Sequence, residues 1–226
     1  MDSWVLITGG SSGIGLQIAR CFWQAGYSLI LTGLHKTEFE AVETVLGPSP
    51  AQKYLCWQQD LASLEGAQSL FQRVEESEIQ VEILVNCAGF GDLSEVVESS
   101  QEKITRMGLV NIHSLTQLCL LFGRQMKQRG GGKILNVAST ISFQPLPFMA
   151  VYSASKSYVL SFSQSLTAEL KPYGVDVSCL CPGATRTEFL NVSGIPADKK
   201  KFSLGKLVWA VAMPAEKVAL AGFNGL

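Results

Sequence analysis

The sequence predicts an α/β fold, a doubly wound parallel sheet with helices on both faces. Short apolar runs alternate with longer helical patterns along all 226 residues. Several of these runs are apolar on both faces, as strands buried in a parallel sheet are. Hydrophobic residues make up 47% of the chain and charged residues 16%, against roughly 25% charged residues in a typical soluble domain. Much of this chain is therefore expected to be buried, in the fold or between subunits.

Six strands and six helices follow from the patterns. The strands are the short apolar runs rich in β-branched residues at 4–8, 28–32, 53–58, 83–86, 133–138 and 175–181. The helical patterns lie at 14–25, 38–46, 64–77, 101–128, 151–171 and from 215 onward. Strands that alternate with helices form βαβ units, so we expect a single domain over residues 1–226.

The turns between these elements agree with that order. The first strand runs into a glycine-rich turn before the first helix, and three glycines at 130–132 separate the long helix 101–128 from the next strand. One region departs from the alternation: 191–205 carries Gly194, Pro196 and three consecutive lysines between two apolar helical pieces. It predicts a lid-like insertion near 186–213, the alternative for the lysines being an ordinary solvated loop.

Charge and composition exclude several classes of protein. The net charge is −1, from 18 Lys and Arg against 19 Asp and Glu, and the absence of a basic stripe argues against nucleic-acid binding. No apolar run reaches 18 residues, so we expect no membrane span, and the start of the chain does not resemble a signal peptide. Six scattered cysteines suggest neither a metal site nor a disulfide framework. A reducing cytoplasm fits them best.

The turn after the first strand reads TGGSSGIG at 8–15 and leads directly into a helix. A strand, a glycine-rich turn and a helix N-terminus form the geometry that binds a dinucleotide pyrophosphate, because a Cβ would keep the phosphates away from the backbone N–H groups. The spacing is G-x-x-x-G-x-G rather than G-x-G-x-x-G. The alternative is a tight turn with no ligand.

Tyr152 and Lys156 are four residues apart on a predicted helix, so they share one face. A tyrosine has a pKa of about 10 in water, and a neighbouring ammonium favours the phenolate. We therefore expect a lowered pKa for Tyr152 and proton transfer at a carbonyl oxygen. The alternative is that the two are simply neighbours on an amphipathic helix.

Five segments, in order, resemble those of the short-chain dehydrogenase/reductase family. They are the TGGSSGIG loop, Asp60-Leu61 after the third strand, NCAG at 86–89 with Cys87 in place of an asparagine, YSASK at 152–156 as Y-x-x-x-K, and Pro182-Gly183 after the sixth strand. The resemblance covers nearly the whole chain. It implies a Rossmann-like sheet in the order 3-2-1-4-5-6. The family's seventh strand is expected to be missing, because the chain stops at Leu226, as in a truncated protein.

The resemblance also implies the site residues. The catalytic group consists of Ser139, Tyr152, Lys156 and Asn111. Within it, Ser139 binds the substrate oxygen, Lys156 reaches the nicotinamide ribose, and Asn111 holds a water in a proton relay to Lys156. The implied cofactor contacts are Gly9, Ser11, Ser12, Gly13, Ile14, Gly15, Asp60, Leu61, Asn86, Ala88, Gly89, Tyr152, Lys156, Pro182, Gly183, Thr185 and Thr187. Of these, Asp60 contacts adenine, while Thr185 and Thr187 meet the nicotinamide carboxamide.

The end of the second strand bears on the cofactor. In NAD-preferring folds an acid there binds the ribose 2′-hydroxyl, but here no acid occurs before Glu38. We therefore expect that a 2′-phosphate is not repelled, and His35 and Lys36 are its expected partners. These observations favour NADP(H), with NAD(H) as the alternative. Leu34 stands where members of the family that use NADP often carry arginine.

The expected function is hydride transfer between NADP(H) and a carbonyl or secondary-alcohol substrate, in the reductive direction. One alternative is an isomerase or epimerase on the same fold, which usually has a larger C-terminal domain. The other is a non-catalytic NADP-binding regulator, which should have lost Ser139, Tyr152 or Lys156. The apolar residues after Ser139 and in the lid either line a substrate site or pack on the domain. We expect a homodimer or homotetramer through the helices 101–128 and 151–171.

Overall fold

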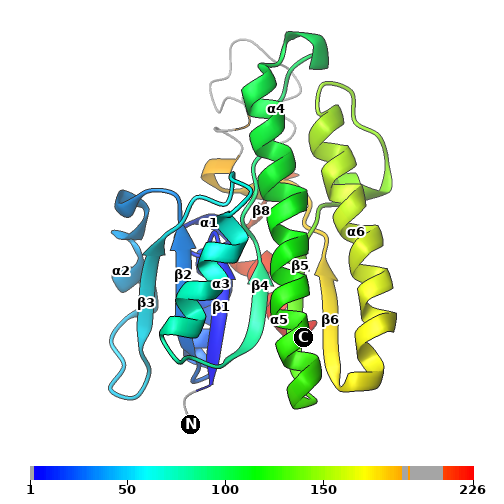
Figure 1. Ribbon diagram of the computed structural model, residues 1–226. Helices are drawn as coiled ribbons and strands as arrows, with labels where there is room; N and C mark the ends of the chain where they lie inside the picture. The colour runs from blue at the N-terminus through cyan, green and yellow to red at the C-terminus, as the bar shows by residue number, and fades with distance from the viewer. Residues whose placement is uncertain (1–2, 190–192, 194–210) are drawn as a thin grey trace.

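The computed structural model, which describes residues 3–189, 193 and 211–226, shows a six-stranded parallel sheet between two layers of helices (Figure 1). The strands are β1 (Trp4–Thr8), β2 (Ser28–Gly33), β3 (Tyr54–Gln58), β4 (Val81–Asn86), β5 (Gly132–Val137) and β6 (Val175–Leu180). Their order is β3-β2-β1-β4-β5-β6, which confirms the predicted order. A small second sheet pairs β7 (Thr185–Arg186) with β8 (Met213–Pro214).

The helices cover both faces of the sheet. The α-helices are α1 (Gly13–Gln24), α2 (Val42–Leu46), α3 (Gly66–Glu76), α4 (Gln101–Gly108), α5 (Leu115–Arg129), α6 (Ala150–Leu170) and α9 (Ala215–Asn224). Short 3-10 helices are η1 (Lys36–Phe39), η2 (Val96–Glu98), η4 (Thr140–Phe143) and η5 (Lys171–Tyr173). A π-helix, η3 (Leu109–Ser114), joins α4 to α5.

Successive side chains along each strand point into two different apolar layers, one on each face of the sheet. On the fully buried β1, Leu6 joins the layer under α3, α5 and α6, while Ile7 joins the layer under α1, α2 and α9. Successive residues of a strand point to opposite faces, so a strand apolar throughout is stable only between two such layers. Phe122 on α5 and Phe22 on α1 lie almost wholly buried in the respective layers.

Two helical predictions differ from the structure in detail. The stretch 38–46 is divided into η1 and α2, and the stretch 101–128 is one helical rod interrupted by the π-helix at Leu109–Ser114. The predicted lid near 186–213 falls mostly on 190–192 and 194–210, outside the described residues. None of the helices in the described part of the chain is long and apolar enough to cross a membrane.

Candidate active site

The predicted site residues gather at the carboxyl edge of the parallel sheet, the upper edge in Figure 1. Because all six strands point the same way, the loops that follow them meet there. The end of β1 is tied to the end of β4: Thr8 Oγ1 accepts hydrogen bonds from Cys87 N and Ala88 N, both at 3.1 Å. The loop after β4 is therefore fixed directly beside the glycine loop.

The glycine loop leaves the N-terminus of α1 open. Ser12 is the N-cap residue of α1, but its side chain makes no capping hydrogen bond in the described structure, and the first turn of the helix contains no acid. Gly13 has a φ of +52°, a left-handed conformation that favours glycine. A Cβ on Gly13 would lie 3.2 Å from Thr187 Cγ2. The loop and the segment around Thr187 thus frame a helix N-terminus whose free N–H groups fit a pyrophosphate.

Ser139 and Tyr152 come together as predicted. The Ser139 hydroxyl lies close enough to that of Tyr152 to lower the tyrosine pKa, and both residues are buried, at 7% and 6% exposure. Ser139 Oγ also donates to Pro182 O at 3.3 Å and accepts from Ile141 N at 3.3 Å. The segment after β6, with Pro182 and Gly183, is thereby attached to Ser139.

The expectation of a lowered pKa for Tyr152 is wrong in direction. Burial raises the pKa above its ordinary value of 10.0, and the hydrogen bond with Ser139 opposes this only in part. Lys156 does not offset the burial, because its Nζ lies 5.8 Å from the centre of the Tyr152 ring and donates to Val137 O at 2.8 Å. Tyr152 is therefore a protonated hydroxyl at neutral pH, suited to donate a proton.

Burial acts on Lys156 in the opposite sense. It lowers the pKa of the ammonium from 10.5 to about 8, because the charged form loses its hydration. The side chain lies against the loop after β4, where Gly89 approaches both Lys156 Nζ and Asn111 Oδ1. The loop after β4 thus lies beside the buried side chains of both Lys156 and Asn111.

Asn111 lies inside the π-helix, a type of turn often found at functional sites. Its side chain is committed to protein groups: Nδ2 donates to Phe90 O and Ser155 Oγ, both at 3.0 Å, and Oδ1 accepts from Phe90 N at 3.2 Å. The amide therefore joins the β4 loop to α6, the helix that carries Tyr152 and Lys156. The role of holding a water for Lys156 stays a prediction.

Two of the predicted cofactor contacts have other partners in the structure. Asn86 is buried, and its Nδ2 donates to Asn136 Oδ1 at 2.9 Å and to Cys119 Sγ at 3.2 Å, while its Oδ1 has no hydrogen-bond partner among the described residues. Its side chain thus connects β4 to β5 and α5. Asp60 lies at the edge of the site, where it caps Ala62 N at 2.8 Å and pairs with Arg106 at 3.4 Å.

The end of β2 differs from its sequence-based interpretation. His35 and Lys36 are exposed, as partners of a phosphate would be. However, the carboxylate of Glu38 folds back onto the end of this strand and accepts a hydrogen bond from Ser11 Oγ. The expectation that no acid reaches this position is therefore wrong. The sequence does contain an acid three residues after His35, but this position is too far along the chain to be assigned to the strand end from the sequence.

The surroundings of Tyr152 are apolar. Its ring packs with buried Met107 and Met149 and with a set of partly buried apolar residues: Phe90, Leu93, Ile141, Leu146, Val151 and Phe189. The ring of Phe189 lies 5.4 Å from that of Tyr152. Several apolar residues predicted to line the substrate site therefore border the Tyr152 ring, whereas Phe143 and Phe148 are exposed.

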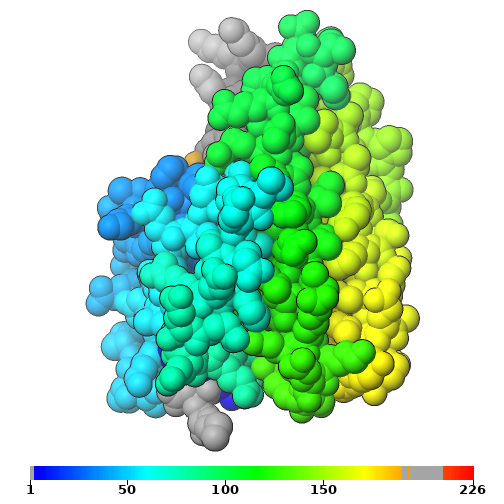
Figure 2. All heavy atoms as spheres, in the orientation of Figure 1, coloured from blue at the N-terminus to red at the C-terminus, as the bar shows by residue number. Residues whose placement is uncertain are grey.

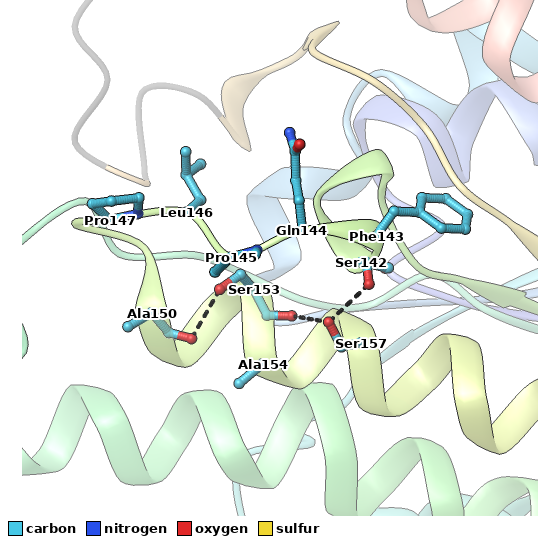
Figure 3. A pocket seen from close by; sticks show the side chains of 10 residues that line it. All are labelled: Ser142, Phe143, Gln144, Pro145, Leu146, Pro147, Ala150, Ser153, Ala154 and Ser157. Carbon is cyan, nitrogen blue, oxygen red and sulfur yellow. Dashed lines mark hydrogen bonds between the residues drawn. The ribbon is translucent and has the colours of Figure 1, made fainter.

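A separate groove lies between the chain at 143–147 and α6 (Figure 3). It encloses about 660 Å³ and is lined by Ser142, Phe143, Gln144, Pro145, Leu146, Pro147, Ala150, Ser153, Ala154 and Ser157. Ser157 Oγ hydrogen-bonds Ser142 O at 2.9 Å and fixes the chain to the helix. Neither Ser139 nor Tyr152 lines this groove, so it is distinct from the catalytic hydroxyls.

Comparison with known proteins agrees with this geometry. A family model described as short chain dehydrogenase matches residues 3–195. The probable oxidoreductase EphD of Mycobacterium tuberculosis is 30% identical over 87% of this chain, and the chain spans only about a third (33%) of the length of EphD.

Two solved structures are similar over nearly the whole chain. A short-chain dehydrogenase from Sphingobium yanoikuyae in complex with NADPH has a TM-score of 0.86 and 31% identity, covering 98% of this chain and 84% of the other. A bulky-bulky ketone specific alcohol dehydrogenase from Comamonas testosteroni has a TM-score of 0.81 and 28% identity, covering 98% and 82% of the two chains.

Replacement of Gly13 should weaken dinucleotide binding. In Gly13→Val the side chain meets Thr187, and the left-handed conformation costs about 1–2 kcal/mol. We expect the affinity for the dinucleotide to fall by at least about tenfold while the circular dichroism spectrum stays native. Fluorescence titration with the reduced cofactor measures this, with Gly131→Ala as a control outside the loop. Normal binding by Gly13→Val would show that the loop is only a turn.

Replacement of Lys156 should stabilise the fold at neutral pH. Lowering the lysine pKa from 10.5 to about 8 costs the native state about 3 kcal/mol below pH 8. This cost disappears as the pH rises toward 10.5, because the unfolded chain then loses its proton too. We expect Lys156→Met to be more stable than the wild type at pH 7. The gain is smaller by about 1 kcal/mol than the cost of the charge, because the variant loses the hydrogen bond of Lys156.

Urea unfolding at pH 7 and pH 9.5 measures the difference between the two proteins. Between pH 7 and pH 9.5, the free energy of unfolding of the wild type should rise by about 2 kcal/mol relative to that of Lys156→Met. The exposed Lys217→Met on α9 is the control and should show no such change. A pH-independent difference for Lys156→Met would mean that Lys156 is charged in the native state throughout this range.

Proposed function

Because the chain belongs to the short-chain dehydrogenase family, we propose that it transfers a hydride between NADP(H) and a carbonyl or secondary-alcohol substrate. The observation that carries this proposal is the buried assembly of Ser139, Tyr152 and Lys156 at the carboxyl edge of the sheet. A non-catalytic regulator has no need of these three side chains in one place. An isomerase or epimerase on this fold remains the second candidate.

The residues present fit a dinucleotide. The open N-terminus of α1 suits the pyrophosphate, and Thr187 beside Gly13 leads toward the catalytic group. The segment from Pro182 to Thr185 is joined to Ser139 through Pro182 O, and within it Thr185 Oγ1 donates to Gly183 O at 2.9 Å. When bound, the nicotinamide supplies or accepts the hydride.

The side chains handle the proton and the substrate oxygen. Tyr152 is protonated at neutral pH, as an ordinary tyrosine is, and burial raises its pKa further, so it donates a proton to the oxygen of a carbonyl substrate. Ser139, which lies beside Tyr152, holds the same oxygen. Lys156 lies one turn further along α6 and positions the ribose. A protonated tyrosine supports the reductive direction.

Support for NADP(H) comes from the exposed His35 and Lys36 at the end of β2 and from the NADPH of the Sphingobium relative. NAD(H) is the alternative. The substrate is proposed to be a ketone or alcohol with apolar substituents, because Met149, Phe189 and Ile141 border Tyr152. The specificity of the Comamonas relative for bulky ketones agrees with this.

We further propose a homodimer or homotetramer that forms through α4, α5 and α6. These helices lie side by side on one face of the molecule (Figure 2), where a hydrogen bond of 3.0 Å joins Thr116 to Tyr158. Leu120 on α5 is 42% exposed and Tyr158 on α6 is 37% exposed. The cytoplasm is the proposed location, supported by six free cysteines.

Removal of the Tyr152 hydroxyl tests the mechanism. Tyr152→Phe removes the transferable proton and little volume, so we expect turnover to fall by about 100-fold or more with cofactor binding nearly unchanged. Absorbance of the reduced cofactor, followed over a panel of ketones and alcohols, measures the rate. Tyr158→Phe on the same helix is the matched control. Retained turnover in Tyr152→Phe would rule out the assigned acid.

A charge on the outer face of α5 tests the assembly. Leu120→Glu would bury a carboxylate in the proposed interface, which is unfavourable without a partner. We expect this variant to be smaller than the wild type in light scattering, while Leu64→Glu, at a leucine 66% exposed elsewhere, leaves the size unchanged. A wild type that is already monomeric at micromolar concentration would contradict the proposed assembly.

A further inference from the structure

Asp92 lies in the loop after β4, where three side chains donate to its carboxylate. Its Oδ2 accepts from Ser94 Oγ at 2.6 Å and from Ser99 Oγ at 2.7 Å, and its Oδ1 pairs with Lys103 Nζ of α4. The Asp92 side chain is only 12% exposed. An exposed ion pair stabilises a fold little, but a nearly buried carboxylate with three donors holds the surrounding chain in place.

This carboxylate is charged at neutral pH. Burial alone would raise its pKa, but the hydrogen bonds from Lys103, Ser94 and Ser99 outweigh that effect and hold the pKa below its ordinary value of 3.8. An asparagine at position 92 would have no charge and only one oxygen to accept from these donors. Replacement of Asp92 by Asn therefore loosens the loop with almost no change in the volume of the side chain.

The residues on both sides of Asp92 face the apolar cluster around Tyr152. Leu93 packs in that cluster. A Cβ on Gly91 would lie 3.2 Å from Cε of Met149, which is another member of the cluster. The loop after β4 is therefore a wall beside Tyr152, and Asp92 attaches this wall to α4.

The same loop contacts a residue with an unusual backbone conformation. Ser94 N donates to Phe148 O at 2.8 Å, and Phe148 has a φ of +65°, which residues other than glycine rarely adopt. Such conformations persist only where neighbouring contacts hold them, and they are frequent at functional sites. Met149, the next residue, is buried in the cluster around Tyr152 and is the N-cap residue of α6. The loop thus contributes Leu93 to the cluster directly and holds Met149 through Phe148.

We propose that Asp92 is a positioning residue that sets the selectivity of the enzyme for the size of the ketone substituents. It acts through Ser94 and Phe148, which fix Leu93 and Met149 beside the Tyr152 ring. A large apolar substituent contacts this wall and a small one does not, so only the large ketone depends on how the loop is held. The inference rests on the proposed function, because it assumes that a ketone binds beside Tyr152.

The ratio of kcat/KM for a large ketone to kcat/KM for a small one tests the inference, because this ratio does not depend on how much of the enzyme is folded. The probes are acetophenone and acetone, or else the largest and the smallest ketone of the panel that the wild type reduces. We expect Asp92→Asn to lower kcat/KM at least about tenfold for the large ketone and less than about twofold for the small one. The affinity for the reduced cofactor, from fluorescence titration, should stay within about twofold of the wild type.

Asp176→Asn is the matched control, since Asp176 is exposed on β6 and its replacement changes the net charge equally. Lys103→Met removes the ion pair from the side of α4, should lower the ratio in the same direction, and serves if Asp92→Asn folds poorly. Lys103→Arg keeps the charge and should keep the wild-type ratio. A ratio that stays level or rises in Asp92→Asn, or in Lys103→Met where Asp92→Asn does not fold, overturns the inference, as does an equal fall in Asp176→Asn. A wild type that reduces no ketone and binds neither reduced dinucleotide overturns the proposed function, and the inference with it.

Discussion

The central strand β1 is the constraint on which the rest of the structure depends. It is buried along its whole length between two apolar layers and pairs in parallel with β2 on one side and β4 on the other. Thr8 ends this strand and accepts the two N–H groups at the start of the β4 loop. One hydroxyl thereby ties the glycine-rich turn to the loop that faces Lys156.

Burial also sets the chemistry of the site. Tyr152 and Lys156 on α6 are both desolvated, and burial favours the neutral form of each group. The pKa of the tyrosine therefore rises and the pKa of the lysine falls. Tyr152 is neutral at pH 7, whereas Lys156, with a pKa of about 8, is still mostly charged there, and in an apolar pocket that charge is costly. The site therefore holds its proton on Tyr152 rather than on a preformed ion pair. The apolar cluster around Met149 and Phe189 maintains that state.

Patterns of apolar residues were sufficient to predict the six strands, and the resemblance to the short-chain dehydrogenase/reductase family implied their order and the grouping of Ser139, Tyr152 and Lys156. They were not sufficient where a side chain forms contacts distant in the chain. The π-helix at Asn111 depends on Phe90 and Ser155, which lie on other elements. Glu38 reaches back to Ser11, 27 positions earlier. The direction of the Tyr152 pKa shift depends on how deeply its helix is buried, which spacing alone does not reveal.

The packing of α9 on α1 has a consequence for the synthesis of the chain. Phe22 contacts Phe223 edge to face, with 5.0 Å between the ring centres, and Ala219 completes the same apolar layer. Until the ribosome has synthesised the segment between α1 and α9, the face of α1 that packs against α9 has no partner. The nascent chain thus carries an uncovered aromatic side chain on α1 until residues 215–224 emerge, and exposed apolar surface of this kind favours aggregation.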